Sequence, residues 1–282
     1  MDEYVKANRQ LWNSWTPYHV RSAFYDVEGF KAGRVRRRHG VDHLHTRLVG
    51  DVRGMSFLHL QCHFGLDTIA WAQRGAVVTG IDFSSEAIQA ARRLAGEMGI
   101  PATFVCSDVY ELPSNLDGRF DIVYTSDGVL GWLPDLEPWA KVVAHFLAPG
   151  GRFHLIEGHP FALIFDDRGP APELRVLYPY FQGPEPIREE MEGSYAAPDA
   201  PIHSVQHVWI HPLADVVGSL LRAGLQIESF AEYPYVAWQM FPWMEKRADG
   251  TWQLPGGANT LPLMFSLCAR KQAAAPRALE PA

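Results

Sequence analysis

The pattern of hydrophobic and polar positions is most regular between residues 55 and 156, where short apolar runs alternate with longer amphipathic segments. The apolar runs, each four to six residues long, occupy residues 55–60, 76–81, 103–106, 120–124 and 152–156. Three intervening segments have the spacing of an amphipathic helix: 67–74, 84–98 and 136–146. Strands buried on both faces are continuously apolar, and parallel strands need crossover connections, usually helices. The pattern therefore predicts a doubly wound α/β fold with a mostly parallel sheet.

The segments on either side of this region follow other patterns. Residues 1–50 have helical spacing interrupted by glycines, and they hold too many aromatic side chains for a free tail. Residues 159–211 are rich in proline and aromatic residues, and an unstructured loop of this length is uncommon in a compact domain. The alternation returns after residue 212, with a helix predicted at 212–223 and strands at 225–232 and 261–269.

These patterns predict a chain organised in five parts. Residues 1–50 form a helical cap, 51–158 the first half of the sheet, 159–211 an inserted lid, and 212–271 the rest of the sheet. Residues 272–282 have the composition of a disordered tail.

Composition limits the classes of partner. The chain has 25 Lys and Arg against 32 Asp and Glu, a formal net charge of −7, which argues against a general nucleic-acid binder. The one basic run, Arg34 to Arg38, fits the solvated end of a helix. The three cysteines are far apart, as expected of reduced and mostly buried thiols. With no apolar leader and no membrane-length apolar run, we expect a soluble cytoplasmic protein, a monomer or homodimer.

A candidate ligand site follows from the loop "LQCHFGLDT", which joins the first predicted strand to the first helix of the alternating region. In a doubly wound sheet, ligands bind beyond the carboxyl ends of the strands. Asp82 ends the second strand roughly 20 residues past this loop, where a carboxylate accepts hydrogen bonds from ribose hydroxyls. Asp108 follows the third strand and could accept from an exocyclic amine such as that of adenine. Together these positions predict a nucleoside site.

These residues resemble the class I S-adenosylmethionine-dependent methyltransferases over roughly residues 55–270. The first motif of that family, acidic-x-Gly-x-Gly-x-Gly, falls here on His59, Gln61, His63 and Gly65. The ribose-binding acid of the family falls on Asp82 and its adenine-contacting acid on Asp108. The resemblance implies a Rossmann-like, seven-stranded sheet whose last strand, 261–269, is reversed. The "LQCHFG" motif resembles a bacterial subgroup that acts on small molecules.

The first motif departs from the family pattern. His59 replaces the usual acid, and Gln61 and His63 replace two glycines. A pyrophosphate needs close approach to several backbone N–H groups, which favours glycine, but S-adenosyl-L-methionine carries no phosphate. We expect Gln61 and nearby backbone carbonyls to hold the methionine ammonium in place of the missing acid. The cofactor-binding residues expected from the resemblance are Tyr18, Tyr25, Gln61, His63, Gly65, Asp82, Phe83, Asp108, Val109 and Ser126.

Candidate catalytic residues lie after the fourth and fifth strands. Methyl transfer is a direct displacement that needs a base only when the acceptor must lose a proton. Asp127 and His159 are the predicted bases; Glu157 and His207 are further candidates, and each could instead cap a loop or pack in the core. The pair His43 and His45 could in principle bind a metal, but without a third ligand we interpret both as surface histidines and predict no metal.

The acceptor class follows from an absent motif and from the aromatic residues. Methyltransferases of nucleic-acid bases and protein amides usually carry an Asn/Asp-Pro-Pro-aromatic motif where this chain has "TSDG", at residues 125–128. A small apolar or aromatic acceptor is therefore predicted. Two alternatives stay open. A non-catalytic S-adenosylmethionine-binding regulator would have the same cofactor residues, whereas an NAD-dependent oxidoreductase would need the Gly-x-Gly-x-x-Gly that "QCHFGL" lacks.

Overall fold

The computed structural model describes residues 2–34, 42–169, 172–258 and 260–272. Most of the predicted basic run, residues 35–38, and the predicted tail from residue 273 onward lie outside the described residues.

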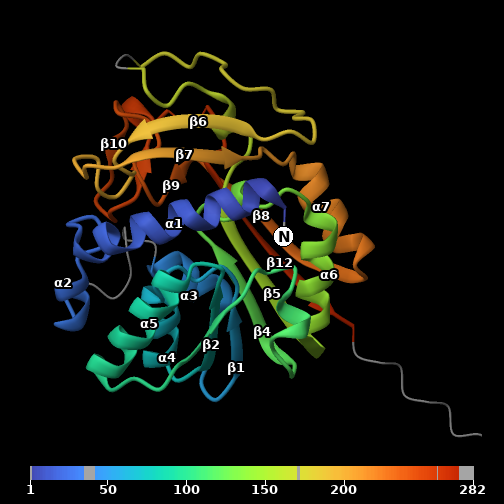
Figure 1. The fold of residues 1–282 in the computed structure, drawn as a ribbon. Helices are drawn as coiled ribbons and strands as arrows, with labels where there is room; N and C mark the ends of the chain where they lie inside the picture. Colours follow the sequence, from blue (N-terminus) through green and yellow to red (C-terminus); the bar gives the residue numbers. More distant parts are fainter. Residues whose placement is uncertain (1, 35–41, 170–171, 259, 273–282) are drawn as a thin grey trace, which may run out of the picture.

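A seven-stranded sheet forms the centre of the molecule (Figure 1). Its strands are β1 (Ser56–His59), β2 (Val77–Asp82), β3 (Thr103–Cys106), β4 (Phe120–Ser126), β5 (Leu147–Gly158), β8 (Leu225–Tyr233) and β12 (Met264–Lys271). Their order is β3-β2-β1-β4-β5-β12-β8, and β12 runs antiparallel to both β5 and β8. The predicted doubly wound sheet with a reversed last strand is therefore confirmed. The strand order changes direction between β1 and β4, which is where this kind of fold binds ligands.

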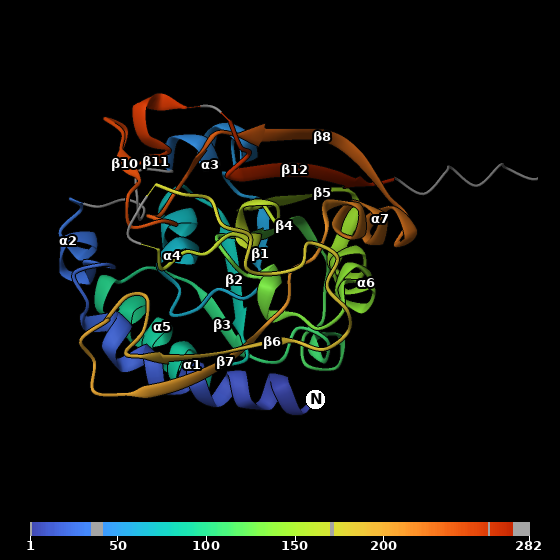
Figure 2. The same ribbon diagram turned by 90° about the horizontal axis from the view of Figure 1, so that it is seen from above.

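Helices cover both faces of the sheet (Figure 2). They are α3 (Asp42–Val49), α4 (Leu66–Gln73), α5 (Ser85–Met98), α6 (Leu136–Phe146) and α7 (Leu213–Arg222). Because neighbouring strand residues point to opposite faces, Leu58 packs in the core that includes α6 and α7 while Phe57 packs in the core that includes α3 and α4. The boundaries of α5 follow its sequence signals, since Ser84 Oγ accepts from Ala87 N at 3.1 Å and Gly99 ends the helix with φ of 64°.

The N-terminal segment crosses the molecule beside the carboxyl ends of the parallel strands (Figure 1). It contains α1 (Glu3–Arg21) and α2 (Val27–Lys31), and α1 continues through Pro17 where the sequence suggested a break. A β-hairpin, β6 (Ile187–Glu192) and β7 (His203–Val208), lies against α1 and gives structure to the predicted lid segment.

Four side chains of α1 bond to the segment that carries this hairpin. Asn8 forms a reciprocal pair with the backbone of His207, with Nδ2 to O at 2.6 Å and N to Oδ1 at 3.0 Å. Trp15 Nε1 donates to Ser204 Oγ at 2.9 Å. The other two bonds are Tyr4 to Glu185 at 3.1 Å and His19 to Ser194 at 2.9 Å. Positions 4, 8, 15 and 19 lie on one helix face, so α1 and the hairpin form one continuous layer.

A second small sheet was not predicted from the sequence. It consists of β9 (Tyr235–Val236), β10 (Glu245–Lys246) and β11 (Trp252–Gln253), in the order β10-β11-β9. Two-residue strands are too short to show a period of two, so pattern analysis cannot detect them. Its buried residues, among them Val236 and Phe241, extend the core on the side of α3 and α4.

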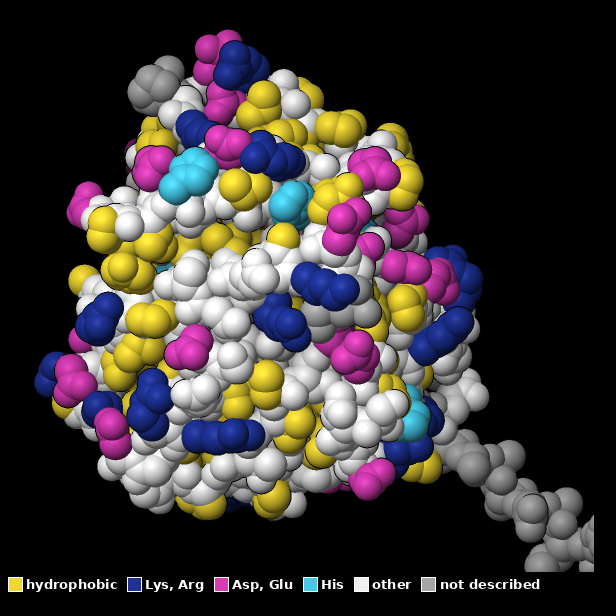
Figure 3. All heavy atoms as spheres, in the orientation of Figure 1, with side chains coloured by type: hydrophobic (Ala, Val, Ile, Leu, Met, Phe, Trp, Pro, Cys, Tyr) yellow, Lys and Arg dark blue, Asp and Glu magenta, His cyan; other side chains and the backbone are white. Residues whose placement is uncertain are grey.

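The surface is mixed in charge. On the face in Figure 3, basic and acidic side chains are interspersed, so this face presents no continuous basic strip. The described part of the chain contains no helix both long and apolar enough to cross a membrane. All three cysteines are free; Cys62 is buried as predicted, but Cys106 is exposed.

Candidate functional site

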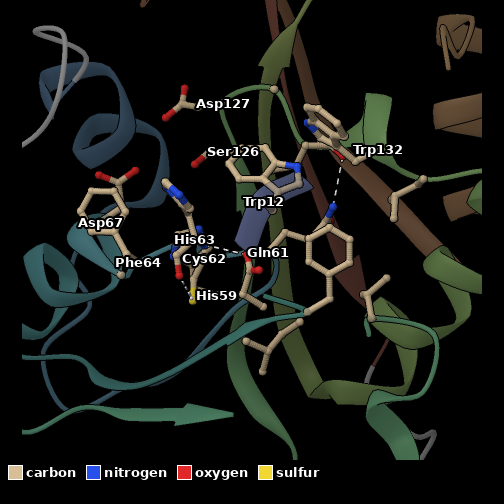
Figure 4. Close-up of a pocket in the computed structure, with 18 of the residues that line it drawn as sticks. Trp12, His59, Gln61, Cys62, His63, Phe64, Asp67, Ser126, Asp127 and Trp132 are labelled. Carbon is tan, nitrogen blue, oxygen red and sulfur yellow. Dashed lines mark hydrogen bonds between the residues drawn. The ribbon is translucent and has the colours of Figure 1, made fainter. Parts of the chain in front are cut away.

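A cavity of about 970 Å³, a volume that includes space open to solvent, lies at the carboxyl ends of β1, β2, β3 and β4. This size falls in the usual range for small-ligand sites. The predicted residues that line it are Tyr25, Gln61, His63, Gly65, Asp82, Phe83, Asp108, Val109, Ser126 and Asp127. Figure 4 shows Gln61, His63 and Trp12 gathered around this space, with Ser126 and Asp127 to one side. The fold thus brings together residues from four separate loops.

The loop between β1 and α4 keeps a glycine-like backbone although it has lost glycines. Gln61 and His63 have φ of 55° and 52°, and Gly65 has φ of 80°. A left-handed conformation costs a non-glycine residue roughly 1–2 kcal/mol, and such strain concentrates at functional sites. At the third position glycine is obligatory, because an added Cβ would lie 2.7 Å from the Phe104 ring. The chain therefore keeps the loop shape at a cost in stability.

Contacts from neighbouring elements hold this loop. His63 N donates to Asp82 Oδ2 at 2.8 Å, which ties the loop to the end of β2. Gln61 Nε2 donates to the carbonyl of Val129 at 3.1 Å, which ties it to the loop after β4. These bonds leave the Gln61 carbonyl oxygen buried, and within the described residues it has no hydrogen-bond partner.

Asp82 and Asp108 occupy the positions expected for a nucleoside site. The Asp82 carboxylate also accepts from Ser84 N at 2.8 Å, and burial raises its pKa to about 6. Asp108 Oδ1 accepts from Tyr110 N at 2.9 Å, and burial raises the pKa of this carboxyl as well. Each carboxylate oxygen has two lone pairs, so both side chains are oriented by the backbone and keep capacity to accept from a ligand.

The position of the family's missing acid is occupied by a histidine held in the protein. His59 is buried, and its Nδ1 lies 2.8 Å from Thr68 Oγ1. A second polar atom of the cavity lining, Ser126 Oγ, is also buried without a partner among the described residues. Buried polar atoms are nearly always hydrogen-bonded. Ser126 Oγ and the Gln61 carbonyl oxygen therefore suit the polar end of a ligand.

Glu157 anchors the loop that follows β4. Its carboxylate accepts from the backbone N–H groups of Gly128 at 2.6 Å, Val129 at 2.8 Å and Leu130 at 3.3 Å, and from its neighbour Gly158 at 2.7 Å. Burial raises its pKa to about 7. Glu157 therefore has the loop-capping role that the sequence left open, and it holds Asp127 in place at the cavity, with a backbone φ of 64°.

Three residues considered from the sequence lie outside the cavity lining. His159 is buried, with Nε2 at 2.9 Å from Glu232 Oε1 and Nδ1 accepting from Phe161 N at 3.1 Å, so both ring nitrogens have protein partners. His207 packs its ring on Tyr4, with 5.0 Å between centroids. Tyr18 lies on α1 beneath the Arg21 guanidinium.

Aromatic side chains form one wall of the cavity. Trp12 of α1 and Trp132, from the loop after β4, meet edge to face with centroids 5.1 Å apart, and Trp12 also lies 4.9 Å from the His63 ring. The hydroxyls of Tyr25 and Tyr195 bond to each other, which links the cap to the lid segment. Sequence analysis noted the aromatic surplus but did not assign Trp12 or Trp132 to the site, because no local motif distinguishes them from core residues.

The structure also corrects the interpretation of His45 as a surface histidine. Its side chain is fully buried, and Nδ1 bonds to the hydroxyl of Tyr124. The side chain of His43 lies outside the described residues. In the described part of the chain no cluster of three or more His, Cys, Asp or Glu side chains could hold a metal.

Comparison with known sequences identifies the central region. Residues 57–151 match the family model of the methyltransferase domain. A ubiquinone biosynthesis O-methyltransferase of Bordetella avium is 32% identical over 132 residues, which cover 46% of this chain and 54% of that protein. A protein of the same name from Alkalilimnicola ehrlichii is 33% identical over 134 residues, 47% of this chain and 54% of that one. The chain thus spans about half the length of the curated relatives it matches.

Solved structures share the fold over a longer range. An S-adenosylmethionine-dependent methyltransferase from Mesorhizobium loti has a TM-score of 0.56 at 21% identity, covering 82% of this chain and 97% of that one. Magnesium protoporphyrin IX methyltransferase from Synechocystis PCC 6803, with bound SAH, has a TM-score of 0.54 at 17% identity, covering 96% of this chain and 100% of that one. The chain therefore carries a methyltransferase domain at residues 57–151, within a sheet of the Rossmann-like methyltransferase fold.

Proposed function

We propose that this chain transfers a methyl group from S-adenosyl-L-methionine to a small apolar or aromatic acceptor. The observation that carries the proposal is the meeting of Asp82, Asp108 and the left-handed loop in one cavity of the matched domain. In this arrangement Asp82 accepts from the ribose hydroxyls and Asp108 from the adenine amine. The Gln61 carbonyl oxygen and Ser126 Oγ accept from the methionine ammonium.

The cofactor supplies a methyl group on a sulfonium, ready for direct displacement. The protein must then align the acceptor, exclude water and take up a proton if the acceptor carries one. Trp12 and Trp132 present ring faces and edges to a flat acceptor, and Tyr25 with Tyr195 closes the layer above them. Asp127 is the better placed of the two predicted bases, because it lines the cavity and His159 does not.

Two further observations narrow the acceptor. The curated relatives are named as O-methyltransferases of ubiquinone biosynthesis, so phenolic hydroxyls are the first acceptor group to test. The aromatic wall favours an acceptor held by buried area and ring contacts.

Two measurements test this proposal in order. Calorimetry with S-adenosylhomocysteine and with NAD should show binding of the first ligand alone. Incubation with methyl-labelled S-adenosyl-L-methionine and a panel of phenols, amines, thiols and carboxylates should then label a member of the panel, phenols first. Binding without labelling of any acceptor would favour the non-catalytic regulator, and binding of NAD would refute the cofactor assignment.

A further inference from the structure

A buried chain of side chains stands behind Asp127. The Tyr124 hydroxyl bonds to His45 Nδ1, and the opposite ring nitrogen, Nε2, lies 3.7 Å from Asp127 Oδ1. Tyr124 and His45 are fully buried, and the Asp127 side chain is 4% exposed. The three residues come from β4, from α3 of the cap, and from the loop after β4. They therefore connect the cap to the edge of the cavity.

The neighbouring backbone explains why Asp127 stays at this point. Its φ of 64° is unfavourable for aspartate outside a special turn, and the next three backbone N–H groups are held by Glu157. Asp127 N also donates to the carbonyl of Ile156 at 3.0 Å. The backbone is thus fixed from β5, which leaves only the direction of the carboxylate to be set by side chains.

His45 can set that direction through its tautomer. A tyrosine hydroxyl is normally a donor, so the bond from Tyr124 places the lone pair on Nδ1 and the hydrogen on Nε2, facing Asp127. A buried N–H directed at a carboxylate stabilises its ionised form and restricts its rotation. The same division of labour, with one residue accepting the proton and another holding it in place, occurs in catalytic triads.

We propose that His45 is a positioning residue that holds the Asp127 carboxylate ionised and directed for proton acceptance from the methyl acceptor. This inference rests on the proposed function. When the acceptor atom forms its new bond to the methyl carbon, the carbon–sulfur bond breaks and its electron pair stays on sulfur. The acceptor's proton passes to Asp127. His45 keeps its own proton, and Tyr124 keeps His45 in the required tautomer.

The groups that face Asp127 from the described elements determine the sign of the pH effect. His45 lies on α3, Glu157 on β5, Tyr124 on β4, and Asp67 in the first turn of α4 lines the same cavity. The two acids disfavour a further negative charge, and His45 opposes them. Removing its N–H should therefore move the titration of Asp127 to higher pH.

The test compares His45→Leu, His45→Gln and Tyr124→Phe with the unchanged protein. Carbon-13 NMR of the aspartate carboxyl groups, with the Asp127 signal assigned from Asp127→Asn, should show its titration midpoint rising by about one pH unit or more in His45→Leu. His45→Gln keeps an N–H donor and should restore part of the shift, and Tyr124→Phe should give a smaller shift of the same sign. His145→Gln, on the opposite face of the sheet, is the matched control and should give none.

Kinetics with a phenolic acceptor supply the second readout. The acid limb of kcat should move upward with the NMR midpoint, giving about a tenfold loss at pH 6 and a much smaller one at pH 8, with unchanged affinity for S-adenosylhomocysteine. An unmoved midpoint in both folded variants, His45→Leu and Tyr124→Phe, would overturn the role of His45. A moved midpoint with full activity in Asp127→Asn would overturn it too. A protein that methylates no acceptor would refute the proposed function and this role together.

Discussion

Asp82 combines a structural task with the proposed binding task. Its two carboxylate oxygens accept backbone hydrogen bonds from His63 and Ser84, so one side chain fixes both the loop after β1 and the start of α5. In the same position it faces the cavity. Because hydrogen bonds to a charged group contribute more than those between neutral groups, this residue should dominate ligand affinity.

Replacing this carboxylate by the amide of the same size tests that expectation. Asp82→Asn should weaken binding of S-adenosylhomocysteine by roughly 1.5–3 kcal/mol, about 10- to 100-fold in Kd. Calorimetry measures the affinity, and circular dichroism confirms that the variant is folded. Asp117→Asn, at an exposed position, is the control. Unchanged affinity in Asp82→Asn would remove Asp82 from the site.

The pKa of Asp82 predicts how binding depends on pH. Burial raises this pKa to about 6, so the empty site increasingly holds the neutral acid as the pH falls below that value. Ribose hydroxyls donate to the anion and therefore favour it. Affinity for S-adenosylhomocysteine should be about tenfold lower at pH 5 than at pH 7, a range in which the amino and carboxyl groups of the ligand keep their charges. In Asp82→Asn the same comparison should be nearly flat.

Among the elements, the strands of the large sheet were predictable and the lid hairpin was not. Buried strands such as β4 and β5 are continuously apolar, so burial itself produces the pattern that identifies them. By contrast β6, "IREEME", has no apolar face, because its backbone pairs with β7 on one side and the hairpin covers α1 through polar contacts. Its stability depends on a helix almost 200 residues away, which no local pattern reveals.

The candidate site divides in the same way. Asp82 and Asp108 were predictable because their place after consecutive strands carries the chemistry. His45 was misjudged because its partners, Tyr124 and Asp127, are about 80 residues distant in sequence and meet it only in the fold. His159 has the right position after a strand, but its ring turns to Glu232 at 2.9 Å, away from the cavity. Side-chain direction after a strand end is a tertiary property.

The loop between β1 and α4 should exchange stability for binding. Gln61→Gly relieves a left-handed residue and should stabilise the fold by up to about 1 kcal/mol, less whatever the lost bond to Val129 contributes. The same change removes a proposed ligand for the methionine ammonium and should weaken binding of S-adenosylhomocysteine severalfold. Denaturant unfolding and calorimetry give the two values. Gly65→Ala should act oppositely on stability, because its Cβ would lie 2.7 Å from Phe104.

At the level of the whole molecule, the two parts that cover the cavity come from distant regions of the chain. The cap contributes Trp12 and Tyr25, and the lid segment contributes Tyr195. The hydrogen bonds of α1 to the hairpin unite these parts. A ligand that needs both sides of this layer can enter only when they separate or through the opening that remains, so the layer should influence both affinity and exchange of ligands.

The reciprocal pair between Asn8 and His207 is the most specific test of this union. Asn8 is fully buried, so Asn8→Ala leaves a backbone N–H and a carbonyl of β7 without their partners and should cost about 1–3 kcal/mol. Asn8→Asp keeps an acceptor for the N–H but places a second acceptor beside the carbonyl, so it should also destabilise. Denaturant unfolding measures the loss, and hydrogen exchange should rise in α1 and β7 together. Gln10→Ala, on the exposed face of the same helix, should have little effect.

Two aromatic residues of the lid segment allow the acceptor role of this layer to be separated from its structural role. Tyr195 lines the cavity and is 44% exposed, whereas Trp209 is 3% exposed and donates from Nε1 to the carbonyl of Pro184 at 3.0 Å, outside the cavity lining. Tyr195→Ala should therefore raise the KM of an aromatic acceptor about tenfold with little change in affinity for S-adenosylhomocysteine, because a single ring contact and its buried area contribute about 1–2 kcal/mol. Trp209→Ala should lower the unfolding free energy by several kcal/mol instead, the usual cost of emptying a buried aromatic site. If Tyr195→Ala lowered cofactor affinity and left acceptor kinetics unchanged, the lid segment would belong to the cofactor and the aromatic acceptor would have to bind elsewhere in the cavity.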